Sequence, residues 1–473
     1  MMSAEFGIMG LGVMGKSLCL NLANKGFHLA LYNRRLEGVE EDVADQFIEQ
    51  HPSLTNARGY EQLAAFVKYL EVPRKILLMV PAGKAVDQLI GQLIPKLSPG
   101  DILIDGGNSH YKETQRRIQE LHEHQIHFIG AGISGGEEGA LKGPSIMPGG
   151  NPEAYALVSR YLENIAARDQ AGKACCAYIG PDGAGHFVKM VHNGIEYAEM
   201  QLLTEVYSLF RFGQGKNPDQ IAEILESWKS QGLNSYLLEI TVDILRRKEE
   251  NDWLLDKVLD QAANKGTGSW TTVAASELGV PATMITAALF ARYLSSFKQE
   301  RLRAEEAFAF STHKSGNGHE LAVEDIRFAY QTARIINHHQ GFQLIQAAAQ
   351  EYAWQLNLAE IARIWTNGCI IRSDLMEKLA QSRWEESNLL LQSPFKEETR
   401  AHSHHLGQVV SEAIFQGIPL PCMAAAIQYL QAYVQGNSAA NLIQAQRDYF
   451  GAHTYQKIDD PSRKAFHSDW KGN

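Results

Sequence analysis

The 473-residue chain is poor in cysteine and has no long apolar run. Its five cysteines are too few and too scattered for a disulfide-stapled scaffold, and they indicate a reducing compartment with buried thiols. None of their spacings is typical of a zinc ribbon or a CxxC pair, so we expect no metal site. No apolar stretch reaches the roughly 18 residues of a membrane-spanning helix, and the N-terminus lacks a secretory pattern. We therefore expect a cytoplasmic protein without a membrane partner.

A surplus of positive charge is also missing. The chain carries 44 Lys and Arg against 54 Asp and Glu, for a net charge of −10. This balance argues against bulk binding to nucleic acid, because the phosphate backbone attracts basic surfaces. It leaves room for one local basic pocket that binds a small anion. With 45% hydrophobic residues, the chain can build the cores of two or three domains.

Two kinds of pattern divide the chain near residue 180. Before that point, short apolar runs alternate with amphipathic helical stretches, which predicts βαβ units and a parallel sheet. The strand-like runs are 6–9, 27–32, 76–80, 102–104 and 127–129. After the turn Gly180-Pro181-Asp182-Gly183, patterns of period 3.6 dominate, and they cover 184–212, 236–247, 280–298, 322–354 and 406–434. We expect a Rossmann-type α/β domain over 1–180, a large all-α domain over 181–435 and a polar C-terminal tail over 436–473.

The first strand leads directly into a glycine-rich loop that opens a helical pattern. Its sequence is Gly10-Leu11-Gly12-Val13-Met14-Gly15, a GxGxxG motif. Glycines allow the backbone to approach a pyrophosphate closely, and the helix N-terminus supplies free N–H groups and a partial positive charge. The motif predicts dinucleotide binding. A glycine-rich turn without a ligand is the alternative.

The residues after the second strand indicate which dinucleotide binds. An NAD site usually has an acidic residue there, but this strand ends in Arg34 and Arg35, with no carboxylate before Glu37. Two guanidinium groups suit a 2′-phosphate, because each forms several charge-assisted hydrogen bonds. We expect NADP rather than NAD; a solvated pair of surface arginines is the alternative.

The helical pattern that starts at residue 184 carries a stripe of reactive side chains. Five of its side chains share one helix face, since they lie at positions i, i+3, i+4, i+7 and i+8: Lys189, His192, Asn193, Glu196 and Tyr197. An amine and a carboxyl group on one stripe are typical of acid–base catalysis, and the stripe follows the predicted domain boundary, where a cleft is expected. An ordinary solvated helix face is the alternative.

Other polar positions are candidates for anion or sugar binding. The stretch 105–109 and the tripeptide Ser134-Gly135-Gly136 each follow a predicted strand, at the sheet edge where ligands bind. Plain glycine turns are the alternative. The loop 265–268 combines Lys265, Thr267 and two glycines, Arg292 interrupts an apolar helix, and the tail contains Arg447 and His453.

Four long motifs resemble one enzyme family. They are LIDGGNS at 103–109, SGGEEGA at 134–140, GAGHFVKMVHNGIEY at 183–197 and NLIQAQRDYFGAHTY at 441–455. Together they are similar to 6-phosphogluconate dehydrogenase over essentially the whole chain. The resemblance implies an NADP-dependent oxidoreductase that decarboxylates 6-phosphogluconate to ribulose 5-phosphate and carbon dioxide, with roles in the pentose phosphate pathway and gluconate utilization.

The resemblance also implies residue roles. Lys189 is the expected general base and acid at the C3 hydroxyl, and Glu196 the acid that protonates C1. Further cofactor contacts are expected from Asn33, Val80, Ala82 and Asn108. The expected ligands of the sugar acid are Asn108, Ser134, Gly135, Gly136, His192 and Asn193. The expected phosphate ligands are Tyr197, Lys265, Thr267 and Arg292. Arg447 and His453 are expected to complete the site of a partner subunit in a homodimer with exchanged tails.

The chain departs from this family pattern near the cofactor and the phosphate. Pro81 and Ser269 stand where lysines are frequent, Arg35 where Ser or Thr is usual, and Gly12 where Ala is common. Two other functions share part of this pattern: a short β-hydroxyacid dehydrogenase of the hydroxyisobutyrate type, and a non-catalytic dinucleotide sensor. The long helical half argues against the first, and the Lys189 and Glu196 pair against the second.

Overall fold

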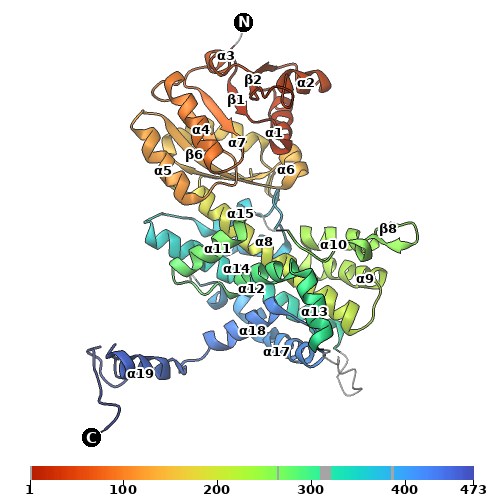
Figure 1. Ribbon diagram of the computed structural model, residues 1–473, viewed down its shortest axis with the longest axis vertical. Helices are drawn as coiled ribbons and strands as arrows, with labels where there is room; N and C mark the ends of the chain where they lie inside the picture. The colour runs from red at the N-terminus through yellow and green to blue at the C-terminus, as the bar shows by residue number, and fades with distance from the viewer. Residues whose placement is uncertain (1–2, 264–265, 309–320, 385–387, 473) are drawn as a thin grey trace. The chain divides into compact units, whose positions relative to one another are not determined.

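The computed structural model describes residues 3–263, 266–308, 321–384 and 388–472 (Figure 1). It contains two compact units, residues 1–426 and residues 427–473. All five cysteines are free and buried, as expected from the sequence. Across the described residues, none of the helices is both long and apolar enough to span a membrane. The domain boundaries at 180 and 435 stay predictions.

A seven-stranded sheet occupies the first 150 residues, in the order β3-β2-β1-β4-β5-β6-β7. Its strands are β1 (Phe6–Met9), β2 (Leu29–Tyr32), β3 (Ala57–Tyr60), β4 (Lys75–Leu78), β5 (Ile102–Asp105), β6 (His127–Ser134) and β7 (Ser145–Gly150). Neighbours pair in parallel except β6 and β7, which are antiparallel. The predicted Rossmann-type fold is confirmed. The sequence did not predict β3, a half-exposed edge strand, or β7, which contains a proline and two glycines.

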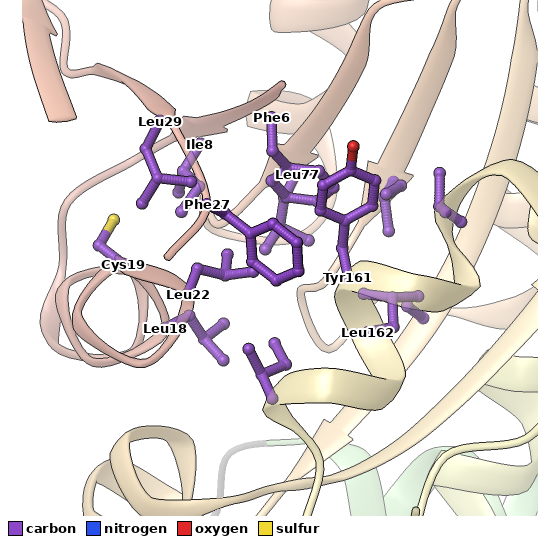
Figure 2. Close-up of a cluster of buried hydrophobic side chains, with 14 of the residues drawn as sticks. Phe6, Ile8, Leu18, Cys19, Leu22, Phe27, Leu29, Leu77, Tyr161 and Leu162 are labelled. Carbon is purple, nitrogen blue, oxygen red and sulfur yellow. The ribbon is translucent and has the colours of Figure 1, made fainter. Parts of the chain in front are cut away.

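Helices cover the sheet, and their apolar faces form its core. They are α1 (Val13–Asn24), α2 (Val43–Gln50), α3 (Leu63–Tyr69), α4 (Lys84–Leu93), α5 (Tyr111–His122), α6 (Gly136–Lys142) and α7 (Pro152–Ile165). Figure 2 shows the side of the core where α1 and α7 meet the sheet. Tyr161 of α7 stacks on Phe6 of β1 with ring centroids 4.9 Å apart. This burial holds β1, and with it the glycine-rich loop that follows, in a fixed position.

The rest of the chain is almost wholly helical, as the period of 3.6 predicts. The helices are α8 (Ala184–Ser208), α9 (Pro218–Trp228), α10 (Tyr236–Arg246), α11 (Thr267–Glu277), α12 (Thr283–Ser295), α13 (Lys298–Phe308), α14 (Val323–Glu351), α15 (Leu358–Ile364), α16 (Asp374–Gln381), α17 (Phe395–Phe415), α18 (Pro421–Tyr433) and α19 (Ala440–Gly451). Between α10 and α11 lies a small hairpin of β8 (Lys248–Glu249) and β9 (Asp252–Trp253). The apolar pattern over 406–434 is not one helix: it breaks where Gly417 has φ +72° and Pro421 starts a new helix.

Helix α8 connects the sheet to the helical half. It contacts β6 and β7 near its start and α11, α12 and α14 further along (Figure 1). Glycines make the first contact possible: a Cβ on Gly185 would overlap the carbonyl oxygens of Gly130 and Met147, and one on Gly132 would overlap the Lys189 side chain. The helix therefore lies directly on the backbone of the sheet.

A buried ion pair fixes the middle of α8. Glu199 accepts hydrogen bonds from Arg334 of α14 at 2.7 Å and from Asn337 at 3.1 Å. Asn337 also donates to the backbone oxygen of Ile195, one turn earlier on α8. Removing one partner of such a pair leaves an uncompensated buried charge, which strongly destabilises the folded protein. The network therefore fixes the rotation of α8 about its axis and the direction in which its reactive stripe points.

We predict that Gly185→Ala destabilises the protein, because the added methyl group overlaps main-chain atoms that have no room to move. The expected loss is about 1–3 kcal/mol, as for other overpacked cores. Gly91→Ala is the matched control, since Gly91 lies exposed within α4 and its added methyl meets nothing within 4 Å. That change should stabilise by about 0.5–1 kcal/mol. Urea unfolding midpoints measure both, and equal midpoints would contradict the close-packing argument.

Candidate active site

A cavity of about 370 Å³ lies at the carboxyl ends of β1, β2 and β4. This is the point where the strand order reverses, because β2 lies on one side of β1 and β4 on the other. Ligands of doubly wound sheets bind at such a point. Six of the predicted cofactor residues line the cavity: Gly10, Leu11, Gly12, Asn33, Arg34 and Val80. The other described residues predicted for the cofactor, namely Val13, Met14, Gly15, Arg35, Ala82 and Asn108, lie outside its lining.

The glycine-rich loop has the geometry of a dinucleotide cradle. Gly10 has φ +97°, and a Cβ there would overlap the carbonyl oxygen of Met79. By contrast, a Cβ on Gly12 would meet nothing within 4 Å. The N–H of Leu11 donates to Asn33 Oδ1 at 3.1 Å, which ties the loop to the end of β2. The backbone is therefore preformed to face a pyrophosphate.

The predicted arginine pair lies at the end of β2 and is accompanied by carboxylates. Arg34 Nε lies 3.2 Å from Glu40 Oε2, and Arg35 lies 3.4 Å from Glu41 and 3.7 Å from Glu61. Glu40 also lines the cavity. Glu40 is not predicted from the sequence, because the strand-end rule applies to an acidic residue next to the strand, whereas a tight turn brings Glu40 back from seven residues beyond Asn33.

The reactive stripe of α8 is buried rather than solvated, except for a partly exposed Glu196. Lys189 Nζ donates to Asn193 Oδ1 at 2.8 Å and lies 3.3 Å from His192 Nδ1. His192 Nε2 in turn lies 3.3 Å from the hydroxyl oxygen of Ser134, and its Nδ1 lies 3.8 Å from Glu196. The predicted grouping of these side chains is therefore present in the fold.

Burial changes the protonation of this group. The loss of water around Lys189 lowers the pKa of its amine, although the nearby Glu196 carboxylate opposes that shift. Burial and the neighbouring Lys189 likewise hold the pKa of His192 well below its usual range, so this imidazole is neutral near pH 7. A lowered pKa brings the Lys189 amine closer to the range in which a general base works.

The loop after β5 borders the same site. Asp105 accepts hydrogen bonds from the N–H of Gly107 at 3.0 Å and from the Ser109 hydroxyl at 2.6 Å, which fixes the loop between them. Asn108, held by this loop, lines one small pocket together with Lys189 and Asn193. Gly135 and Gly136, beside Ser134, have φ of +120° and +64°, where glycine is favoured. Asn108 and Asn193 therefore lie beside Lys189, and Ser134 is linked to Lys189 through His192. Gly135 lines a different pocket, together with Arg168 and Arg372.

A cationic group lies two turns further along α8. The Arg292 guanidinium of α12 stacks on the ring of Tyr197 at 3.7 Å, so the structure brings these two predicted residues together. Gly268 of α11 lies against the same ring, since a Cβ there would contact it at 2.5 Å. Lys265 lies outside the described residues, and only the backbone of Thr267, the first residue of α11, is described.

The compact unit formed by residues 427–473 carries the two predicted tail residues. Arg447 and His453 are both exposed there. The buried carboxylate of Asp448 organises the unit by accepting hydrogen bonds from the Thr454 backbone at 2.9 Å and the Trp470 indole at 2.7 Å. In the described parts of the chain, no three His, Cys, Asp or Glu side chains are grouped as metal ligands.

Comparison with known proteins decides the family. The model for the NAD binding domain of 6-phosphogluconate dehydrogenase matches residues 5–180, and the model for the C-terminal domain of the same enzyme matches residues 185–470. The chain belongs to the 6-phosphogluconate dehydrogenase family. The short β-hydroxyacid dehydrogenase considered from the sequence is therefore not its family.

Individual members of the 6-phosphogluconate dehydrogenase family match over their full length. The NADP(+)-dependent, decarboxylating enzyme of Bacillus subtilis is 47% identical, covering 99% of this chain and 100% of its own. The decarboxylating enzyme of Escherichia coli is 44% identical with the same coverage. The Plasmodium falciparum enzyme, whose structure was solved in its apo form, with its cofactor NADP+ and with its substrate 6-phosphogluconate, superposes with a TM-score of 0.92 at 37% identity, covering 98% of this chain and 100% of its own.

We predict that Gly10→Ala weakens NADP binding at least about 100-fold, because the loop cannot keep a left-handed residue in contact with Met79. Gly12→Ala is the matched control and should change NADP affinity less than about threefold. A methyl group at Gly12 meets no atom within 4 Å, and the φ of Gly12, −70°, is allowed for alanine. Titration of tryptophan fluorescence with NADP measures both, with circular dichroism as a check on folding. Equal losses in the two variants would contradict the proposed cradle.

Proposed function

We propose that this chain catalyses the NADP-dependent oxidative decarboxylation of 6-phosphogluconate to ribulose 5-phosphate and carbon dioxide. The observation that carries the proposal is the buried Lys189 amine, bonded to Asn193 at 2.8 Å and bordered by the loop that holds Asn108. The full-length similarity to decarboxylating 6-phosphogluconate dehydrogenases supports the same reaction.

The residues at the end of β1 and β2 fit NADP. The preformed glycine loop faces the cavity, and Arg34 offers a guanidinium to the 2′-phosphate. Bound NADP supplies the acceptor for the hydride that leaves C3 of the substrate. Asn33 holds the loop in place through its bond to Leu11.

Lys189 acts first as a base and then as an acid. Its neutral amine accepts the proton of the C3 hydroxyl as C3 is oxidised to a ketone. The ketone then withdraws electrons from the bond between C2 and the carboxylate, so carbon dioxide leaves and an enediol forms. The protonated Lys189 donates its hydrogen bond to the developing oxygen anion, and a partly desolvated site makes that bond strong.

Glu196 completes the reaction by delivering a proton to C1 of the enediol. It lies two turns beyond Lys189 on the same face of α8, so the base and the acid are separated along the length of the substrate. We assign the carboxylate and hydroxyls of the substrate to Asn108, Ser134, Gly135, Gly136, His192 and Asn193. We assign its phosphate to Tyr197, Arg292, Lys265 and Thr267, since Arg292 already stacks on Tyr197 at one end of the stripe.

We further propose a homodimer in which each tail completes the partner's phosphate site through Arg447 and His453. Exposed apolar residues of the same unit, Leu442, Ile443 and Phe450, support an interface there. We also propose a cytoplasmic enzyme of the pentose phosphate pathway and of gluconate utilization; the five free thiols are consistent with a reducing compartment.

We predict that Lys189→Met lowers kcat about 100- to 10,000-fold, because the change removes the amine that we assign as the acceptor of the C3 proton. NADP binding should stay within about twofold, since the cofactor cavity is not changed. The assay follows NADPH and carbon dioxide together, with NADP and NAD run side by side. Lys68→Met, which removes an exposed lysine from α3, is the matched control and should be fully active. Wild-type turnover in Lys189→Met would overturn the assignment of the base.

We predict that two inactive variants complement each other if tails are exchanged. Subunits with Lys189→Met and subunits with Arg447→Ala, co-expressed under two tags, form mixed dimers in which one of the two sites keeps both residues. Pure mixed dimers should recover about half of the wild-type activity, because a two-fold symmetric dimer has two equivalent sites. Purified mixed dimers without activity would show that Arg447 serves the site of its own subunit.

A further inference from the structure

The cofactor site contains an acidic residue that the proposed reaction does not use. We infer that Glu40 determines cofactor specificity. Its carboxylate repels a 2′-phosphate bound at Arg34 and accepts a hydrogen bond from a ribose hydroxyl of NAD. Glu40 therefore reduces the preference for NADP over NAD. The inference rests on the proposed NADP-dependent function and concerns the selectivity of that same site.

A short turn brings Glu40 to the end of β2. Leu36 and Glu40 exchange two backbone hydrogen bonds of 2.7 Å, and Gly38 at the tip has φ +73°. The chain thereby folds back on itself directly after Arg35. As a result Glu40 lines the cofactor cavity together with Asn33 and Arg34, with 35% of its side chain exposed.

One oxygen of Glu40 joins two residues of the cofactor site. Its Oε2 accepts from Arg34 Nε at 3.2 Å and from Asn33 Nδ2 at 3.3 Å. In NAD-binding Rossmann sites, a carboxylate at the end of the second strand accepts the ribose 2′-hydroxyl. This chain places such a carboxylate and a guanidinium at the same point, so the site holds an acceptor for a hydroxyl and a donor for a phosphate side by side.

The charges around this point do not favour a phosphate strongly. The two guanidiniums of Arg34 and Arg35 face three carboxylates, those of Glu40, Glu41 and Glu61. Pro81, which lines the same cavity, supplies no cation. Arg34 is 71% exposed, and exposed ion pairs are easily exchanged, so a 2′-phosphate can bind Arg34. The phosphate then binds next to the Glu40 carboxylate or displaces it from Arg34. Repulsion between these two negative groups lowers the affinity for NADP.

Glu40→Gln tests the inference, because it keeps the size of the side chain and an acceptor oxygen but removes the charge. The full-length variant should bind NADP about 3- to 10-fold more tightly, and this gain should shrink at high salt. NAD should bind no more tightly than to the wild type, so the ratio of kcat/KM for NADP over NAD rises. Dissociation constants come from fluorescence titration with each cofactor, and kcat/KM from assays with 6-phosphogluconate.

Glu37→Gln is the matched control, since it removes the same charge from an exposed position of the same loop. The inference about Glu40 is overturned if the ratio of kcat/KM for NADP over NAD stays unchanged or falls in Glu40→Gln. It is also overturned if this ratio rises equally in Glu37→Gln. The wild type gives the separate test of the proposed function: if it neither binds NADP nor oxidises 6-phosphogluconate, that function fails. If the wild type is active and Glu40→Gln leaves the ratio of kcat/KM for NADP over NAD unchanged, only the inferred role of Glu40 is wrong.

Discussion

The close contact between α8 and the sheet is the constraint on which the site depends. Because Gly132 and Gly185 carry no side chain, α8 lies against the backbone of β6 and β7 and excludes water from Lys189. A lysine on an exposed helix keeps its charge, whereas this one is desolvated and its pKa is lowered. The lowered pKa of Lys189, the base that we propose at C3, therefore depends on two glycines in the contact between α8 and the sheet.

The same helix extends from the loops beside Lys189 to the residues that we assign to the substrate phosphate. Its first turns border the loops that follow β5 and β6, and its later turns carry Tyr197, against which Arg292 stacks. Between them, the Glu199 and Arg334 pair holds the rotation of the helix. One rigid element thus sets the distance between the proposed base, the proposed acid and the proposed phosphate ligands, and a rigid scaffold provides orientation in this way.

The cofactor half differs from the α8 site, since the arginines at the end of β2 are exposed and already paired with carboxylates. The backbone geometry at Gly10 suits a pyrophosphate, which NAD and NADP share. The choice between dinucleotides is then left to side chains at the end of β2, where arginines and carboxylates already pair with one another. Selectivity at such a site is a difference between two ion-pairing arrangements and is more easily changed than the fold around it.

By itself the sequence determined the fold class, the first strand and helix, and the stripe from Lys189 to Tyr197, because these depend on local periodicity and on one glycine motif. The motifs also indicated the family that the comparisons then confirmed. Only the tertiary structure decided that the stripe is buried, that β7 runs antiparallel at the sheet edge, and that Glu40 reaches the cofactor cavity. Burial and the meeting of residues distant in the chain arise from packing between elements, which no local pattern encodes, whereas strand and helix periods are written residue by residue.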